Sequence, residues 1–279
     1  MDRRCVLQGV LCVAGLVSVS TSASAQTSVT IGASADNTIY SDAPGNSNVQ
    51  GPGLFAGTTS SSGIRRALIR FDLSVIPAHA PIASVTLTLH MNKTVSGASL
   101  FGVHRLFEEW GEGASNAGDP GGFGTPAAPG DATWNFAFFN TVSWTSPGGA
   151  FDATPSATAS VDQVADYSWS SSGLKDDVQS WVDAPDQNFG WILIGTEADL
   201  SAAKRFDSRN SAVPANQPRL VVEFYCPADF DQNGFVNGDD FDLFVDLFYF
   251  GDPGADWDRN QFVNGDDFDG FTAAFIAGC

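Results

Sequence analysis

Short runs in which apolar and polar residues alternate dominate residues 27–225. In 85–91 the odd positions are apolar and the even positions polar, and 66–73 and 220–224 show a similar alternation. A period of two predicts strands with one buried face. The run 189–194 is apolar on both faces, so it predicts a strand in the middle of a sheet.

Helical periodicity before residue 226 is confined to Leu174, Val178, Trp181 and Val182, which follow the i, i+4, i+7, i+8 pattern of a short connecting helix. Many short strands with little helix predict a mainly β fold, and we expect a jelly-roll β-sandwich over residues 27–225. The Gly-, Ala- and Pro-rich stretch 111–131 predicts a long surface loop, a common place for binding function.

The composition changes at Cys226. Residues 226–279 contain twelve aspartates, one arginine and ten of the 22 phenylalanines. The segment is an internal repeat, because Asp229–Phe241 recurs 27 positions later as Asp256–Phe268. After each copy, phenylalanines at i, i+3 and i+7 predict a helix with one apolar face. They are Phe241, Phe244 and Phe248, then Phe268, Phe271 and Phe275. A solvated acidic tail, the alternative, would not need this spacing.

Both copies fit a twelve-residue, EF-hand-like calcium loop. A hard cation takes oxygen ligands from loop positions 1, 3, 5, 7, 9 and 12, with the backbone carbonyl serving at position 7. The expected ligands are Asp229, Asp231, Asn233, Phe235, Asn237 and Asp240 in the first loop, and Asp256, Asp258, Asn260, Phe262, Asn264 and Asp267 in the second.

Two departures from the EF-hand pattern affect the expected affinity. Position 12 is Asp rather than the longer Glu in both loops. Position 6, which favours glycine for its sharp turn, is Gly234 in the first loop and Gln261 in the second. A non-glycine residue in a left-handed conformation costs about 1–2 kcal/mol. We therefore predict that the second site is the weaker one.

Residues 1–25 have the composition of a secretory signal peptide, with Asp2-Arg3-Arg4, an apolar run and Ala23-Ser24-Ala25 at the expected cleavage site. The protein is therefore expected to be secreted, with anchoring through the apolar run as a minor alternative. Cleavage leaves two cysteines, Cys226 and Cys279, in an oxidising compartment, where one disulfide is expected.

The duplicated loop-helix segment resembles a type I dockerin, and its Cys226-Pro227-Ala228-Asp229 opening and Gly278-Cys279 end are similar to one bacterial subgroup. The resemblance implies a small helical module in 226–279 that holds calcium and joins a cohesin-bearing scaffold or the cell surface, in the setting of polysaccharide degradation. It also implies that the two ends of the module lie close together, as a Cys226–Cys279 disulfide requires. Covalent attachment through Cys279 is the rival interpretation.

The larger segment, 27–225, is similar to the DNRLRE, or disaggregatase-related, domain. The matching stretches are 36–40, 66–74, 103–106, 110–113, Asp177 with Val178 and Trp181, and 188–222. The family overlaps carbohydrate-binding module family 96, which implies a non-catalytic polysaccharide binder on a jelly-roll fold. Sugar rings pack on exposed aromatic faces, and four tryptophans in or beside loops are the candidates: Trp110, Trp134, Trp144 and Trp169.

Other functions receive less support. A net charge of −19 disfavours nucleic acid, which needs clustered Lys and Arg. A glycosidase or polysaccharide lyase acting through Glu108, Glu109 and Glu112 stays an alternative, because glycoside hydrolysis needs paired carboxylates. His79, His90 and His104 lack the spacing of a metal motif such as HExxH. A structural surface protein that binds no sugar is the remaining alternative.

Overall fold

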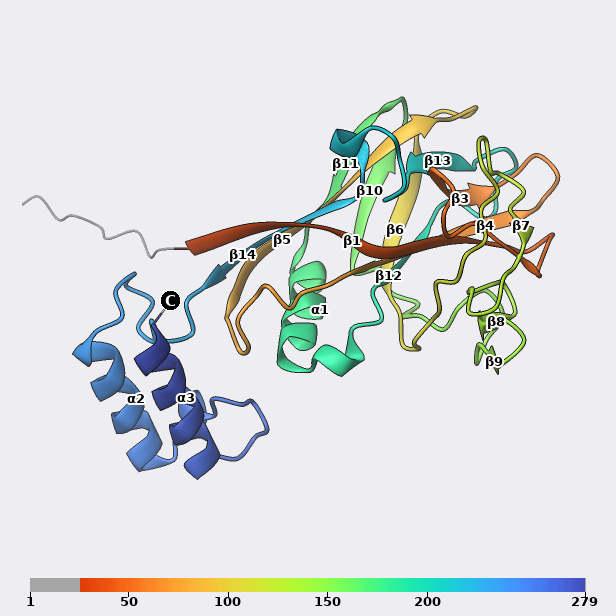
Figure 1. Cartoon of the computed structure of the whole chain (residues 1–279). Coiled ribbons are helices and arrows are strands. Elements are labelled where there is room, and N and C mark those ends of the chain that lie inside the picture. The colour runs from red at the N-terminus through yellow and green to blue at the C-terminus, as the bar shows by residue number, and fades with distance from the viewer. Residues whose placement is uncertain (1–25, 279) are drawn as a thin grey trace, which may run out of the picture.

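The computed structural model describes residues 26–278 (Figure 1). The strands are β1 (Gln26–Tyr40), β2 (Asn46–Ser47), β3 (Gly53–Thr58), β4 (Ile64–Phe71), β5 (Ile82–Lys93), β6 (Ser99–Arg105), β7 (Thr125–Pro126), β8 (Phe136–Phe138), β9 (Val142–Ser143), β10 (Ala157–Val161), β11 (Ala165–Trp169), β12 (Trp191–Ile194), β13 (Lys204–Asp207) and β14 (Arg219–Tyr225). The α-helices are α1 (Ser172–Asp183), α2 (Gly238–Phe250) and α3 (Gly265–Ala277), and single 3-10 turns cover Pro185–Gln187, Pro214–Asn216 and Pro253–Ala255.

The strands form a large antiparallel sheet in the order β1-β14-β5-β13-β3-β4-β12-β6-β10. β11 lies off this path and pairs with the edge of β5 opposite β14. β1 links the two parts of this sheet. Its residues 26–32 pair with β14, and after a register shift between Ala33 and Ala35 its second half pairs with β4. A fold that is mainly β, as predicted, is confirmed, and the arrangement is compatible with a β-sandwich.

The main core lies between these two parts of the sheet. Leu87, Phe206 and Leu220 come from one part, Ile69 and Trp191 from the other, and all are buried in a single apolar cluster. The central strand predicted from 189–194 is β12, which pairs with both β4 and β6. Its Trp191 faces the main core, whereas Ile192 belongs to a second cluster on the opposite face.

The connecting helix predicted from Leu174 to Val182 is α1. It begins after Ser171, whose side-chain oxygen accepts a hydrogen bond from the Leu174 N–H at 3.1 Å, an N-cap that satisfies one of the free amides of the first turn. Its apolar face enters the main core, where Trp181 meets Trp191 edge to face with ring centroids 4.6 Å apart. The helix is therefore held against the end of the sheet, and its last residue is Asp183.

The long irregular segment after β6 covers the outer face of β4 and β12. Its Trp110, Ala132 and Trp144 are buried against Leu68 and Ile192 in the second apolar cluster. Only short pairings interrupt the segment, such as β7 with β2. The loop expected at 111–131 is therefore present, interrupted by β7, and residues on either side of it build the second apolar cluster.

The C-terminal segment forms a small helical module beyond the end of β14, with α2 and α3 side by side (Figure 1). Phe244 of α2 and Phe271 of α3 are fully buried and stack with ring centroids 4.0 Å apart. Each helix begins with an Asn-Asp capping box, Asn237 with Asp240 and Asn264 with Asp267. The two helices predicted from the phenylalanine spacing are therefore confirmed.

Two predictions involve residues outside the described range. The signal peptide proposed for residues 1–25 lies there, and so does Cys279. Cys226 is disulfide-bonded and lines the same cavity as Gly278.

Candidate functional site

Three carboxylates meet in the first loop of the helical module. Asp229, Asp231 and Asp240 each place an oxygen within 4.8 Å of the other two. Asp229 is 3% exposed, its Oδ2 accepts the Gly234 N–H at 2.8 Å, and its Oδ1 is buried without a hydrogen-bond partner. A buried, unpaired carboxylate oxygen is unfavourable unless a proton or cation satisfies it. These residues fit a cation bound by oxygen ligands.

The second loop repeats this geometry. Asp256, Asp258 and Asp267 bring one oxygen each within 4.8 Å of one another. Asp256 Oδ2 accepts the Gln261 N–H at 2.8 Å, and its Oδ1 is again buried and unpaired. Two acidic triads could therefore each hold a metal ion. Recurrence of the unpaired oxygen at loop position 1 distinguishes the triads from chance acidic clusters.

The position-12 aspartates are fixed by the start of each helix. Asp240 Oδ2 accepts the Asn237 N–H at 2.8 Å, and its Oδ1 accepts the Asp231 N–H at 3.1 Å. Asp267 makes the same two bonds, to Asn264 at 2.7 Å and to Asp258 at 3.2 Å. One carboxylate therefore caps the helix and also joins the triad, so helix formation positions a candidate ligand.

The predicted amide ligands bond to the loop backbone. Asn233 Oδ1 accepts the Phe235 N–H at 2.9 Å, and Asn260 Oδ1 accepts the Phe262 N–H at 2.8 Å. Asn237 accepts the Asp239 N–H and Asn264 accepts the Asp266 N–H, each at 2.7 Å, so both asparagines act as N-caps. The Phe235 and Phe262 rings are exposed. The spacing thus brings the carboxylates together, while the amides shape the turns.

The loops differ at position 6. Gly234 has φ 92°, and Gln261 has φ 75°, so both backbones are left-handed. The strain predicted for Gln261 is present, because a side chain at positive φ costs about 1–2 kcal/mol. A weaker second site stays a prediction.

Burial raises the pKa of Asp229, and the charges of Asp240 and Asp231 raise it further, against hydrogen bonds from Gly234 and Asn233 that lower it. Repulsion from its two neighbours therefore adds to burial in disfavouring the charged form of Asp229. A bound cation would relieve this repulsion directly.

Three of the four tryptophans proposed as sugar platforms are buried, which corrects that expectation. Trp110, Trp144 and Trp169 are 1%, 4% and 0% exposed. Their indole N–H groups donate to the carbonyls of Phe189, Thr133 and Phe101, at 2.8, 2.8 and 3.0 Å. Buried rings with satisfied N–H groups are packing residues and offer no face to a ligand.

Trp134 is half-buried, and the Arg66 guanidinium lies over its ring at 4.8 Å from the centroid. This cation–π contact covers one ring face. Trp134 therefore offers a sugar less surface than its loop position predicts.

An aromatic surface that sequence reasoning missed lies elsewhere on the β-rich part of the chain. Phe123, 78% exposed, and the half-buried Phe55 line a cavity of about 380 Å³, hereafter the Phe123 pocket. Phe123 is the single aromatic residue in the Gly-rich stretch 111–131. An aromatic residue alone in a predicted surface loop is the sequence signal that could have indicated an exposed ring. The pocket combines an exposed ring with the Ser60 and Ser61 side of the β3–β4 turn.

The Phe123 pocket is basic although the chain is acidic. Within residues 26–278, its lining includes Arg65, Lys93, Lys204 and Arg205 and no Asp or Glu. Arg65 and Arg205 form ion pairs with Asp42 and Asp119 outside the lining. Lys204 is buried and bonds to hydroxyl and carbonyl oxygens, whereas Lys93 is exposed and pairs with no carboxylate among the described residues.

Two of the three candidate catalytic glutamates of the enzyme hypothesis, Glu108 and Glu112, hold loops in place. Glu112 accepts hydrogen bonds from Arg209 at 3.0 and 2.6 Å and from the Asp36 N–H at 2.9 Å. Glu108 accepts hydrogen bonds from the Thr145 N–H and hydroxyl. His90 and His104 lie in strands β5 and β6 and form hydrogen bonds with the Asp166 side chain and the Asp152 carbonyl.

Comparison with known proteins provides no family assignment. No protein-family model matches the chain, and a search of curated proteins finds no significant match. Among the described helices, none is long and apolar enough to cross a membrane.

Proposed function

We propose that the protein is a secreted, non-catalytic adaptor, in which a glycan-binding β-sandwich is carried by a calcium-dependent, dockerin-like module. The observation that carries the proposal is the duplicated triad with an unpaired, buried oxygen on Asp229 and Asp256. Calcium is the proposed ion because the donors are oxygens at EF-hand spacing and extracellular calcium suffices for modules with dissociation constants of about 10⁻⁴–10⁻³ M.

Calorimetry of the mature chain with calcium tests the metal assignment. Two binding events are expected, abolished one at a time by Asp240→Ala and Asp267→Ala. Magnesium should bind more weakly, since it demands near-ideal octahedral geometry. No calcium binding at millimolar concentrations would refute the proposal.

The partner of the helical module is proposed to be a cohesin-like or cell-surface protein. Support comes from α2, where Leu243, Tyr249 and Phe250 are exposed, the last two at 81% and 80%. Large apolar side chains grouped on an exposed helix mark interaction surfaces. Binding to a panel of recombinant cohesin modules, with calcium or with chelator, tests this assignment. Binding that ignores chelation would contradict a calcium-dependent dockerin.

The glycan is proposed to bind at the Phe123 pocket. An exposed ring suits the apolar face of a sugar, hydroxyls and an unpaired lysine suit its polar groups, and the positive lining favours an anionic sugar despite the net charge of −19. Phe123→Ala and Lys93→Ala should weaken retention on an acidic polysaccharide at least about tenfold. The matched controls are Phe107→Ala, another exposed phenylalanine, and Lys175→Ala, on α1; neither should matter.

A pull-down on insoluble and immobilised polysaccharides, with the supernatants assayed for oligosaccharides, tests the whole assignment. Retention without release is the expected result. Released oligosaccharides would instead identify a glycosidase or lyase. Failure to bind any glycan would favour a structural surface protein.

A further inference from the structure

The second metal loop touches the sandwich through Arg259. Its Nη1 lies 2.6 and 2.5 Å from the two carboxylate oxygens of Asp183, and its Nη2 donates to the His79 carbonyl at 3.2 Å. Asp183 ends α1, and His79 lies in the turn before β5. One side chain of the module therefore bridges two elements of the sandwich.

Arg259 occupies loop position 4, between the candidate ligands Asp258 and Asn260. Its backbone is left-handed, with φ 58°, as is that of Gln232 at the same position of the first loop, with φ 57°. The Gln232 side chain forms no hydrogen bond within residues 26–278. The two loops thus share a backbone conformation, but only the second uses this position to hold the sandwich.

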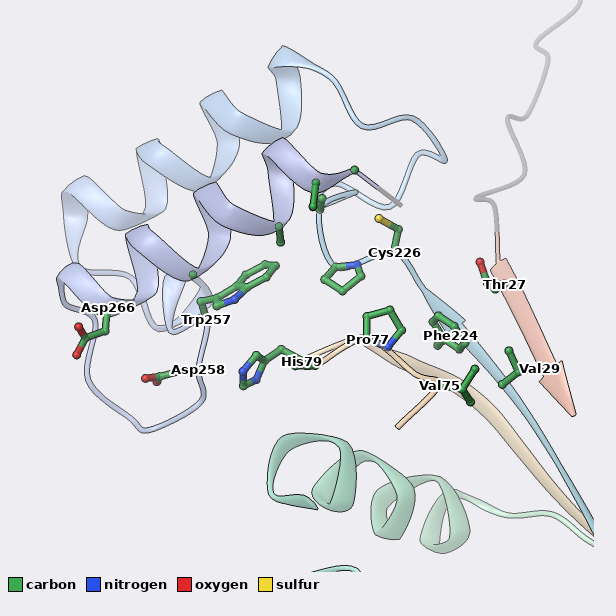
Figure 2. Close-up of a pocket in the computed structure, with 17 residues that line it drawn as sticks. Thr27, Val29, Val75, Pro77, His79, Phe224, Cys226, Trp257, Asp258 and Asp266 are labelled. Atoms are coloured by element: carbon green, nitrogen blue, oxygen red, sulfur yellow. The ribbon is translucent and has the colours of Figure 1, made fainter. Parts of the chain in front are cut away.

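The rest of this contact is loosely packed. A cavity of about 630 Å³ separates the module from the sandwich and is lined by Val75, Pro77, Trp257 and Ala274, among others (Figure 2). The Trp257 and His79 rings lie in its lining as tilted neighbours, with an interplanar angle of 52° and centroids 6.4 Å apart. A loosely packed interface has few contacts to replace a lost ion pair. Arg259 therefore contributes the charged contact that holds the module against the sandwich.

We propose that cation binding in the second loop docks the helical module onto the sandwich, through Arg259. The inference rests on the proposed metal function. Without a cation, the carboxylates of Asp256, Asp258 and Asp267 repel one another. A cation draws together the residues on both sides of Arg259 and so holds its left-handed backbone, which a non-glycine residue otherwise disfavours. By reciprocity, docking favours cation binding in this loop and leaves the first loop unaffected.

Hydrogen–deuterium exchange in the full mature chain tests the coupling. The reporters are the amides of Ala80 and Ala184, which bond within the sandwich to the Pro77 and Ser180 carbonyls and lie next to the acceptors of Arg259. Calcium should slow their exchange by about fivefold, the protection that a partly exposed ion pair typically provides.

Equivalent positions of the two repeated loops supply matched controls. Asp240→Ala, which removes the first site, should retain the calcium-dependent protection, and Asp267→Ala should abolish it. Arg259→Ala should abolish it and Gln232→Ala should not. Exchange across β4 and β12, monitored in the same spectra, verifies that each variant keeps its sandwich folded.

Calorimetry on the same samples separates two kinds of failure. If calcium binds but protection is absent, or is lost equally in Asp240→Ala and Asp267→Ala, the coupling is wrong and the metal function stands. If calcium does not bind, both the metal function and the coupling are wrong.

Discussion

Arg259 and Asp183 join the two parts of this protein across 76 positions of sequence, with the guanidinium 2.5 Å from the nearer carboxylate oxygen. The arginine is the single basic residue of segment 226–279, and the aspartate closes α1. The Arg259 and Asp183 side chains are 36% and 19% exposed, so solvent screens the pair only partly. The single basic residue of the acidic module therefore contacts α1 and the turn before β5 in the β-rich part of the chain.

We expect this pair to stabilise the docked module modestly. Arg259→Gln and Asp183→Asn should each lower the free energy of unfolding by about 0.5–1 kcal/mol, as for other partly exposed ion pairs. The double variant should be hardly less stable than either single variant. Chemical denaturation in saturating calcium checks this by a double-mutant cycle, and strictly additive losses would show that the residues do not interact.

The two acidic loops, 229–240 and 256–267, should differ in their affinity for calcium. The second loop holds Gln261 at φ 75°, and Gln261→Gly removes the strain of about 1–2 kcal/mol, so calcium at that site should bind about five- to thirtyfold tighter. Calorimetry on Gln261→Gly in an Asp240→Ala background isolates the second site. Unchanged affinity, or a tighter second site in the parent chain, would contradict the strain argument.

The buried tryptophans should matter for stability. Trp169 is fully buried, so Trp169→Ala should cost about 3–5 kcal/mol. Trp134→Ala should cost about 1 kcal/mol, because Trp134 is half-buried. Thermal and urea unfolding measure both changes. If Trp169→Ala abolished glycan retention at unchanged stability, its assignment as a packing residue would be wrong.

Asp36 should make stability depend on pH. Burial raises its pKa to about 7, and the Glu112 charge adds to this effect, against Arg209, whose N–H donates to Asp36 Oδ2 at 2.6 Å. The unfolded carboxyl releases its proton near pH 4, whereas the folded one keeps it until about pH 7. The contribution of the Asp36 carboxyl to the free energy of unfolding is therefore fully present below pH 4 and is lost as the pH rises to about 7.

Asp36→Asn removes this titration. Relative to the parent chain, the free energy of unfolding of the variant should rise by about 4 kcal/mol between pH 4 and 8, an order-of-magnitude figure from the difference between a pKa near 4 in the unfolded chain and about 7 in the folded one. Urea unfolding at several pH values, in constant calcium, gives the difference. Parallel stability profiles for the two chains would show that Asp36 titrates normally.

Features with local causes could be predicted from the amino-acid sequence. The candidate ligand positions from Asp229 to Asp240 lie within one twelve-residue loop, where chain geometry alone brings them together. The strained turn at Gln261 and the helices that follow each loop have equally local causes. Alternation in β14 predicted its buried face for the same reason, because successive side chains of a strand point to opposite sides. In β4 the prediction of one buried face was incomplete, since Leu68 on the opposite face is buried in the second apolar cluster.

Which aromatic side chains are exposed to solvent depends on the tertiary structure. Trp110 and Trp144 lie in an irregular segment without periodicity, and their burial depends on contact with Leu68 and Ile192, strand residues far away in the sequence. Phe123 is exposed because the same segment turns it toward solvent. Composition could not show either outcome, since burial of a loop residue depends on which distant face the loop covers. The Arg259–Asp183 pair belongs to the same class, as only folding brings the two residues together.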